Sequence, residues 1–511
     1  MLTYILRRIG VSILILIAAS LLMYILVAWA RDPLQDLYAS NSPNREQLIQ
    51  QRIQWLDLDQ PVLLRWFNWL IGAAQCAIPF GACDLGVTIQ NQPVTILLGR
   101  AMGSTLQLVT ASTIFAIILG ITVGIISALR QYSAVDYTFT FASFFLYSLP
   151  SFVMGVLLKV FVAIGFNDWL QDPLISWATI IVLSLISGVF WQAVIGGERQ
   201  RRLIAFGAGT VVTGAILYFM SATQWFLDPA LGPIVTPLLI AGMAAGMALL
   251  IGGPSARYAW RTAGATAIVV IVAYFALQPV LKSFNGWGVI ALFVGAGIVG
   301  AAAGWLLGEH DKAQAIRIGI FSGLLGMGVI VFDQFLQNWN EYVRNPRVGG
   351  RPIATVGSAT PNLVGDFWIH GIDTFTHLLL PTISLMLISF AGYTRYARGG
   401  MLEVLNQDYI RTARAKGLPE RTVVVRHAFR NSLIPITTIV AADVGGLIGG
   451  AIITEQIFAF SGMGALFNRG LSTGDPNPVM AYFIVVAIFA ITFNFLADLT
   501  YSALDPRVRA K

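Results

Sequence analysis

Long apolar stretches, separated by short polar turns, recur along almost the whole chain. About 20 consecutive apolar residues are needed to cross the hydrocarbon core of a bilayer, and the backbone of such a stretch must satisfy its own hydrogen bonds there. The pattern therefore predicts an all-α polytopic membrane protein with twelve spans. We place these spans at residues 9–29, 103–129, 136–165, 174–195, 203–222, 232–252, 263–281, 286–307, 315–333, 376–397, 433–456 and 479–502.

Composition agrees with this class. Hydrophobic residues make up 56% of the 511 residues and charged residues only 11%, with a mean hydropathy of +0.73. Roughly a quarter of the residues in a soluble domain are charged. The net charge of +7 comes mainly from arginines at the ends of spans. Such a distribution reports membrane topology, and we expect no nucleic-acid partner.

The short loops on one side of the predicted spans carry most of the basic residues. Arg130, Arg257 and Lys312 are examples, and the side that carries them is the cytoplasmic side by the positive-inside rule. An even number of spans puts both termini on that side. The first span follows Arg7 and Arg8 and is too long for the apolar part of a signal peptide, so we expect it to be retained. The expected location is the cell membrane.

One polar, cationic segment, Glu403–Pro435, lies between two long apolar runs. Ile410 and Ala413 fall at helical spacing and form an apolar stripe, whereas Arg411 lies on the polar side. Gly417 follows as a helix stop. The segment predicts a short helix that lies along the membrane surface and can dock into a groove on a partner.

The amino-acid sequence of this segment points to one kind of loop. D-Y-I-R-T-A-R-A-K-G-L, followed by R-H-A-F-R-N-S-L-I-P, resembles the cytoplasmic coupling loop of ABC importer permeases. Only Ala413 and Gly417 match the general pattern of that loop. The full wording is closer to the first of the two permease subunits in dipeptide, oligopeptide and nickel importers. Further matches lie at Met1–Gly10, Asp84–Pro93, Glu455–Gly464 and Asp498–Arg509.

This resemblance implies a six-helix core of the type I importer fold, which forms half of a translocation pathway for peptides. It also implies separate ATPase subunits, a second permease subunit in a heterodimer and an extracytoplasmic substrate-binding protein. The cargo itself stays open among dipeptides, longer peptides and nickel chelates. By the resemblance, the residues that couple the chain to the ATPase are Tyr409, Arg411, Thr412, Ala413, Arg414, Lys416 and Gly417.

The middle of the chain does not resemble the family. We expect three regions: core helices 1–3 in residues 1–165 with an extracytoplasmic segment at 30–102, an inserted region at 166–370, and core helices 4–6 in 371–511 with the coupling loop at 398–432. The insertion, between core helices 3 and 4, contains about six spans as three helical hairpins. It has few ionisable residues inside its spans, so a lipid-facing accessory bundle and a docking platform for another membrane protein are the two interpretations.

Several residues of the span at 433–456 are candidates for the pathway or a subunit interface. Two pairs of glycines, four residues apart, would let helix backbones approach closely at a subunit seam or in internal packing. Asp443 should face protein or water, either along the pathway or as a structural carboxylate. Glu455 matches a glutamate that precedes the outer gate loop of the family. The glycines are Gly445, Gly446, Gly449 and Gly450.

Cys76 and Cys83 are the only cysteines, and they lie in the segment expected on the oxidising side of the membrane. Six residues separate them, which allows a disulfide, although two unrelated thiols would give the same sequence. Two cysteines and four scattered histidines form no metal-binding pattern, and we expect neither a metal site nor another cofactor.

The chain has no G-x-x-x-x-G-K-[ST] motif, the loop that cradles nucleotide phosphates. ATP hydrolysis is therefore expected on a separate chain, and this chain is not expected to be an enzyme. The alternatives are an ion-coupled secondary transporter, which needs more intramembrane carboxylates than Asp443 alone, and a nickel-chelate permease. An intramembrane enzyme built on Ser461 has weak support, because the residue two before it is Ala459 where a serine-protease loop has glycine.

Overall fold

The computed structural model describes residues 2–78, 81–309 and 311–504. Over these residues the regular secondary structure is helical, apart from one isolated bridge between Val87 and Pro93. Eleven helical segments of the described chain are long and apolar enough to cross a membrane. Ten of them coincide with predicted spans, and the eleventh, Ser151–Trp169, covers only the second half of the span predicted at 136–165. The remaining predicted span, at residues 433–456, overlaps α19 (Arg430–Gly450). The prediction of an all-α polytopic fold is confirmed.

The chain divides into two compact units, which are described separately. The first comprises Met1–Val162, Thr355–Ser358 and Leu378–Lys511, and the second comprises Ala163–Ala354 and Ala359–His377. The helix α16 (Phe367–Leu405) begins in the second unit and ends in the first.

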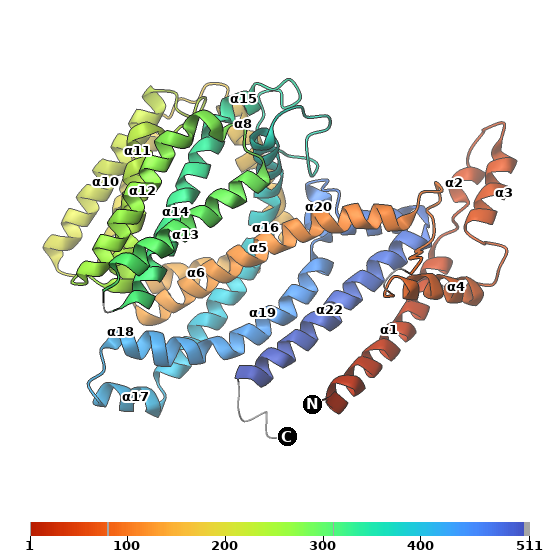
Figure 1. The fold of residues 1–511 in the computed structure, drawn as a ribbon. Helices are drawn as coiled ribbons and strands as arrows, with labels where there is room; N and C mark the ends of the chain where they lie inside the picture. The colour runs from red at the N-terminus through yellow and green to blue at the C-terminus, as the bar shows by residue number, and fades with distance from the viewer. Residues whose placement is uncertain (1, 79–80, 310, 505–511) are drawn as a thin grey trace. The chain divides into compact units, whose positions relative to one another are not determined.

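The first unit is built around its long apolar helices (Figure 1). Its core gathers Tyr24, Leu108, Leu385 and Met480, which come from four different helices and are almost fully buried. In addition to α19 and the C-terminal part of α16, its elements are α1 (Leu2–Ala30), α2 (Gln35–Tyr38), α3 (Arg45–Trp55), α4 (Val62–Gln75), α5 (Val94–Leu129), α6 (Ala134–Ser148), α7 (Ser151–Leu157), α17 (Asp408–Ala415), α18 (Glu420–Thr422), the π-helical η3 (Val423–Phe429), α20 (Ile452–Ile457), α21 (Met463–Thr473) and α22 (Pro476–Leu504).

The second unit contains six of the membrane-length segments, the number predicted for the inserted region. They follow the short α8 (Gly165–Trp169) and precede α15 (Trp339–Val343). The six are α9 (Trp177–Ile195), α10 (Arg199–Ala222), α11 (Gly232–Met247) with the π-helical η2 (Ala248–Gly252), α12 (Arg257–Leu281), α13 (Gly286–Leu307) and α14 (Lys312–Gln337).

Small residues form the tightest seam of the second unit. Gly300 and Gly304 of α13 lie against Gly319 and Ala315 of α14. A Cβ atom added at Gly300 would lie 2.1 Å from the carbonyl oxygen of Gly319. Glycine is therefore required for this backbone approach, which is the usual way in which apolar helices pack when no hydrophobic effect drives them together.

Two predicted spans differ in detail. The single span at 136–165 is wrong, because α6 ends at Ser148 and α7 begins at Ser151. Pro150 explains the break, since proline has no N–H and forces the preceding Leu149 into an extended conformation, with φ −80° and ψ 128°. The span predicted at 376–397 is part of the 39-residue α16, which extends into the predicted coupling loop.

Candidate functional site

The polar segment predicted to form a surface helix contains α17 (Asp408–Ala415). Asp408 lies in its first turn and Arg414 in its last, so both charges complement the helix dipole. Gly417 then adopts a left-handed conformation with φ +75°, which glycine reaches without steric cost. The chain turns there and continues into α18.

One side of α17 packs into the first unit. Ile410 is fully buried and Ala413 is 6% exposed. These side chains share a small apolar cluster with residues of α5, α16 and the segment after α17, namely Ala128, Met401, Val423 and Ala428. The helix is therefore seated on the ends of α5 and α16, and a displacement of α17 would be transmitted to both through packed side chains.

The other side of α17 faces outward and is cationic. The side chain of Arg411 is 71% exposed and lies 3.5 Å from the Asp408 carboxylate. Arg414 donates two hydrogen bonds to the Glu420 carboxylate, at 3.1 and 2.7 Å. These bonds lower the pKa of Glu420. Lys416 is exposed as well.

Two polar side chains of α17 form hydrogen bonds that stabilise it, one within the helix and one to α19. The Thr412 hydroxyl donates to the carbonyl oxygen of Asp408, 2.9 Å away, and the Tyr409 hydroxyl accepts a hydrogen bond from the Asn431 amide at 3.1 Å. The segment thus combines an apolar seated face with an exposed basic face, which suits docking to an acidic or polar groove on another protein.

An ion pair that the sequence analysis missed lies close to the α17 seat. Arg398 of α16 donates from Nε and Nη2 to the two carboxylate oxygens of Asp136 in α6, at 2.8 and 3.0 Å. Asp136 is only 2% exposed and also accepts from the Tyr132 amide. In the sequence, the only sign of this ion pair was the presence of an acidic residue, Asp136, six positions after Arg130.

A second buried carboxylate organises the loop between α20 and α21. Glu455 is fully buried, accepts a 2.6 Å hydrogen bond from the Thr105 hydroxyl, and accepts another from the Ala465 amide. The same Thr105 oxygen accepts from the Met463 amide at 2.8 Å. A Cβ atom at Gly462 would lie 2.3 Å from the Glu455 carboxylate. The loop is therefore tied to α5 by one carboxylate and one hydroxyl.

The candidate glycines of α19 face different surroundings. A Cβ atom at Gly445 would approach Ala490 of α22 to 3.2 Å, and one at Gly449 would approach Val486 to 3.6 Å. A Cβ atom at Gly446 would meet nothing within 4 Å. Asp443 is exposed in this chain. Gly450 ends α19, and its surroundings lie outside the described part of the structure.

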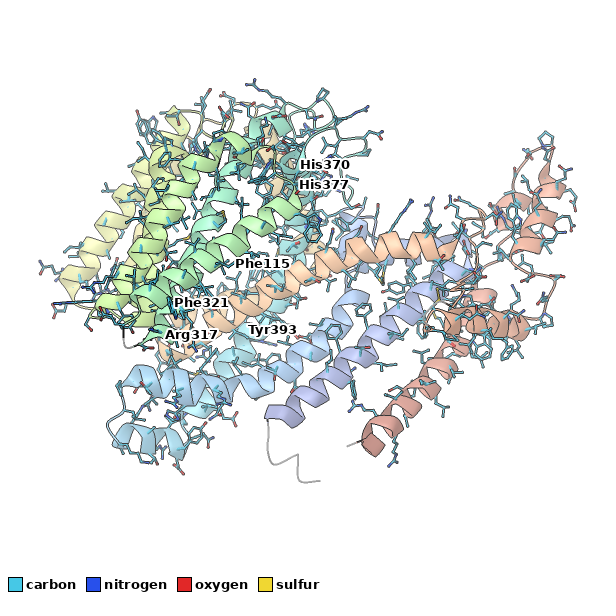
Figure 2. The ribbon with its side chains drawn as sticks, in the orientation of Figure 1. Phe115, Arg317, Phe321, His370, His377 and Tyr393 are labelled. Carbon is cyan, nitrogen blue, oxygen red and sulfur yellow. A yellow bond between two sulfur atoms is a disulfide. The ribbon has the colours of Figure 1, made fainter. Side chains whose placement is uncertain are left out.

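Cys76 and Cys83 form a disulfide whose Cα atoms are 4.2 Å apart. Figure 2 shows His370 and His377 near one another on α16. The His377 Nδ1 atom lies 2.8 Å from the Asp373 carbonyl oxygen. Among residues 2–78, 81–309 and 311–504, no three histidine, cysteine or acidic side chains gather in a way that could hold a metal ion.

Comparison with known proteins finds a family match in the C-terminal part of the chain. Residues 325–510 match the family of binding-protein-dependent transport system inner membrane components. This range contains α17, α19 and the Glu455 loop.

Three relatives illustrate the similarity. The oligopeptide transport system permease protein OppB of Mycobacterium tuberculosis is 25% identical over 506 residues, which cover 99% of this chain and 98% of the relative. AppB of Bacillus subtilis, also an oligopeptide transport system permease protein, is 43% identical over 27% of this chain and 43% of the relative. The dipeptide transport system permease protein DppB of Escherichia coli is 44% identical over 27% of this chain and 41% of the relative.

The coverage of these matches differs in an informative way. The mycobacterial relative aligns along nearly the whole chain, including the region of the second unit. The matches to AppB and DppB extend over only 136 and 140 residues. The resemblance inferred from the sequence motifs is confirmed by all three.

Proposed function

The chain carries a binding-protein-dependent transport permease domain at residues 325–510, and from this premise we propose that it is a membrane-spanning permease subunit of an ATP-driven peptide importer. It is a transport component and not an enzyme. In this role it forms half of a translocation pathway, and ATP is hydrolysed on a separate chain. The observation that carries the proposal is the seated, basic helix α17 within the matched domain.

The proposed mechanism uses α17 as the mechanical link. ATPase subunits close on ATP, and a groove on one of them grips the exposed face around Tyr409, Arg411 and Arg414. The buried face, which includes Ile410 and Ala413, passes the movement to α5 and α16. A ligand must bind one state more tightly by about 5.5 kcal/mol to shift a two-state equilibrium from 1:99 to 99:1, so the groove must discriminate between states on that scale.

Partners and orientation follow from the same proposal. A second, non-identical permease subunit completes the pathway, and an extracytoplasmic protein delivers the peptide. Both termini and α17 lie in the cytoplasm. The last residues, Asp505–Lys511, lie outside the described chain. The core helices belong to residues 1–165 and 371–511, whereas residues 166–370 form an accessory bundle in the bilayer.

The pathway and outer-loop roles are proposed residue by residue. Asp443 and Gly446, which are exposed in this chain, are assigned to the pathway or to the partner seam. Gly445 and Gly449 pack on α22 and keep α19 close to it. Glu455 holds the outer loop. A nickel-chelate cargo is the alternative within the same architecture.

Site-specific crosslinking tests the docking step. The two native cysteines are joined in a disulfide, so a cysteine introduced at Arg411 is the reactive thiol. In the assembled importer it should crosslink to an ATPase subunit. A cysteine at Arg351, which is also well exposed but lies on the opposite side of the membrane in the proposed topology, should give no such product. A crosslink from Arg351 with none from Arg411 would contradict the proposal.

A further inference from the structure

Helix α4 (Val62–Gln75) exposes a surface unlike that of its neighbour α3 (Arg45–Trp55) in the same extracytoplasmic segment. The exposed positions of α3 are mainly polar, as expected for a helix in water, and include Glu46, Gln47 and Gln51. The exposed side of α4 is apolar. Its outward residues are Leu63 (60% exposed), Leu64 (47%), Phe67 (52%) and Ile71 (46%).

These outward residues share one helical face. Leu63, Phe67 and Ile71 are spaced by four, so they lie in one row along the helix. The opposite face is also apolar and packs into the core of the first unit through Trp69 and Ala73. Both of these faces are therefore apolar, and among the described residues only the face with Trp69 and Ala73 packs against the rest of the chain.

The contacts of α4 with α1 place it at membrane level. The Trp66 indole donates a 3.2 Å hydrogen bond to the Ser20 hydroxyl of α1. Ser20 lies ten residues before Ala30, the last residue of α1, which corresponds to about 15 Å along the helix axis. The stretch between Arg8 and Arg31 contains no charged residue. Helix α4 thus packs beside the membrane-spanning part of α1 and not beyond its outer end.

The membrane-length helix α1 exposes apolar side chains of the same kind as the outward face of α4. Leu22, Leu26 and Trp29 of α1 are 61%, 53% and 78% exposed. Figure 1 shows α4 lying across the end of α1. Because α4 packs on α1 near Ser20 and Tyr24, its exposed apolar row is expected at the depth of these exposed residues of α1.

We propose that α4 is an in-plane membrane helix, whose Leu63, Phe67 and Ile71 row is immersed in the acyl chains of the outer leaflet. A lipid surface matches the observations, because interfacial helices bury an apolar face at the boundary between headgroups and acyl chains. The exposed Asn68, which borders the row, would then lie toward the headgroups. The Cys76–Cys83 disulfide forms a short closed loop directly after α4 and so restricts the movement of the C-terminal end of the helix.

Spin-label depth measurements test this inference on the complete importer in nanodiscs. Single cysteines replace Phe67 and Ile71, with Leu26→Cys as the lipid-facing reference and Gln51→Cys as the water-facing reference. A nitroxide on each reports collisions with oxygen, which concentrates in lipid, and with a nickel chelate, which stays in water. The oxygen-to-nickel ratio at positions 67 and 71 should be several-fold above that at 51 and close to that at 26.

Two results would overturn the inference. A ratio at positions 67 and 71 equal to that at 51 would place α4 in water. Low collision rates with both reagents would show that a protein partner covers the row, as the second permease subunit or the substrate-binding protein would. Because all four cysteine positions are exposed side chains, the substitutions leave the packed core intact.

Discussion

Arg398 and Asp136 form a two-pronged ion pair that joins α16 to the start of α6, with N–O distances of 2.8 and 3.0 Å. The two residues are 262 positions apart. The side chain of Asp136 is 3% exposed, whereas that of Arg398 is 29% exposed. The pair therefore fixes the α5–α6 turn to the end of α16, beside the seat of α17.

Loss of Arg398 should destabilise the protein strongly. Arg398→Ala leaves the buried Asp136 carboxylate without its counter-charge, which typically costs about 3–5 kcal/mol. The thermal unfolding temperature of the purified chain should fall accordingly. Arg351→Ala is the matched control, since its pair with Asp168 is more than half exposed on both sides and should contribute under about 1 kcal/mol. Equal effects of the two substitutions would show that the Arg398 pair has no special role.

Gly417 should tolerate asparagine but not valine. Its φ of +75° strains a residue with a Cβ atom by about 1–2 kcal/mol, and most for β-branched side chains, whereas asparagine visits this conformation more readily. No atom lies within 4 Å of a Cβ atom at this position, so the strain is the only cost. Gly417→Val should therefore misplace α17 and reduce peptide uptake, with membrane insertion unchanged. Uptake by the valine variant at the level of the asparagine variant would contradict this.

Thr105→Val tests the outer loop. The substitution keeps the shape of the side chain but removes an oxygen that donates to Glu455 and accepts from Met463. Each buried group left unpaired costs about 1–3 kcal/mol. Hydrogen exchange at the Met463 amide should become faster in Thr105→Val and stay unchanged in Thr105→Ser. Unchanged exchange in the valine variant would show that Thr105 does not hold the loop between α20 and α21 to α5.

Asp475, in the turn between α21 and α22, should make the stability of the folded protein depend on pH. Burial raises its pKa to about 6, although its carboxylate accepts a 2.8 Å bond from the Ile89 amide. The unfolded chain ionises near pH 4. Stability from this group is therefore fully present below pH 4 and is lost as the pH rises through about 6.

The variant Asp475→Asn should therefore be more stable than the wild type at pH 7.5, by at most about 3 kcal/mol. The advantage should shrink as the pH is lowered toward 4. Unfolding temperatures of both proteins across this range measure the effect. An advantage that does not change with pH would show that the carboxyl does not titrate as described.

The sequence was sufficient for features that depend on neighbouring residues. A run of apolar residues of membrane length specifies a helix in lipid whatever surrounds it, and ten of the predicted spans coincide with helices of that kind. Helix α17 was also predictable, because Ile410 and Ala413 mark its buried side within a single turn. The break at Pro150 has a local cause, but the apolar run on both sides of it masked the proline.

Long-range pairing could not be derived in the same way. Nothing near Asp136 identifies Arg398 as its partner, and nothing near Glu455 identifies Thr105, which is 350 residues away. The exposed row of α4 was hidden for a related reason. Apolar residues cover both the exposed face and the packed face of α4, so the sequence alone does not show which of the two packs against α1.

Peptide uptake into sealed vesicles tests the central claim most directly. The importer is reconstituted with its second permease subunit, with or without its ATPase subunits, and uptake of a labelled peptide is followed after ATP is added. Uptake should require both ATP and the ATPase subunits, and Arg411→Glu should abolish it because the exposed guanidinium of α17 is reversed in charge. Uptake that continues without the ATPase subunits would contradict the claim that a separate ATPase, acting through α17, drives transport.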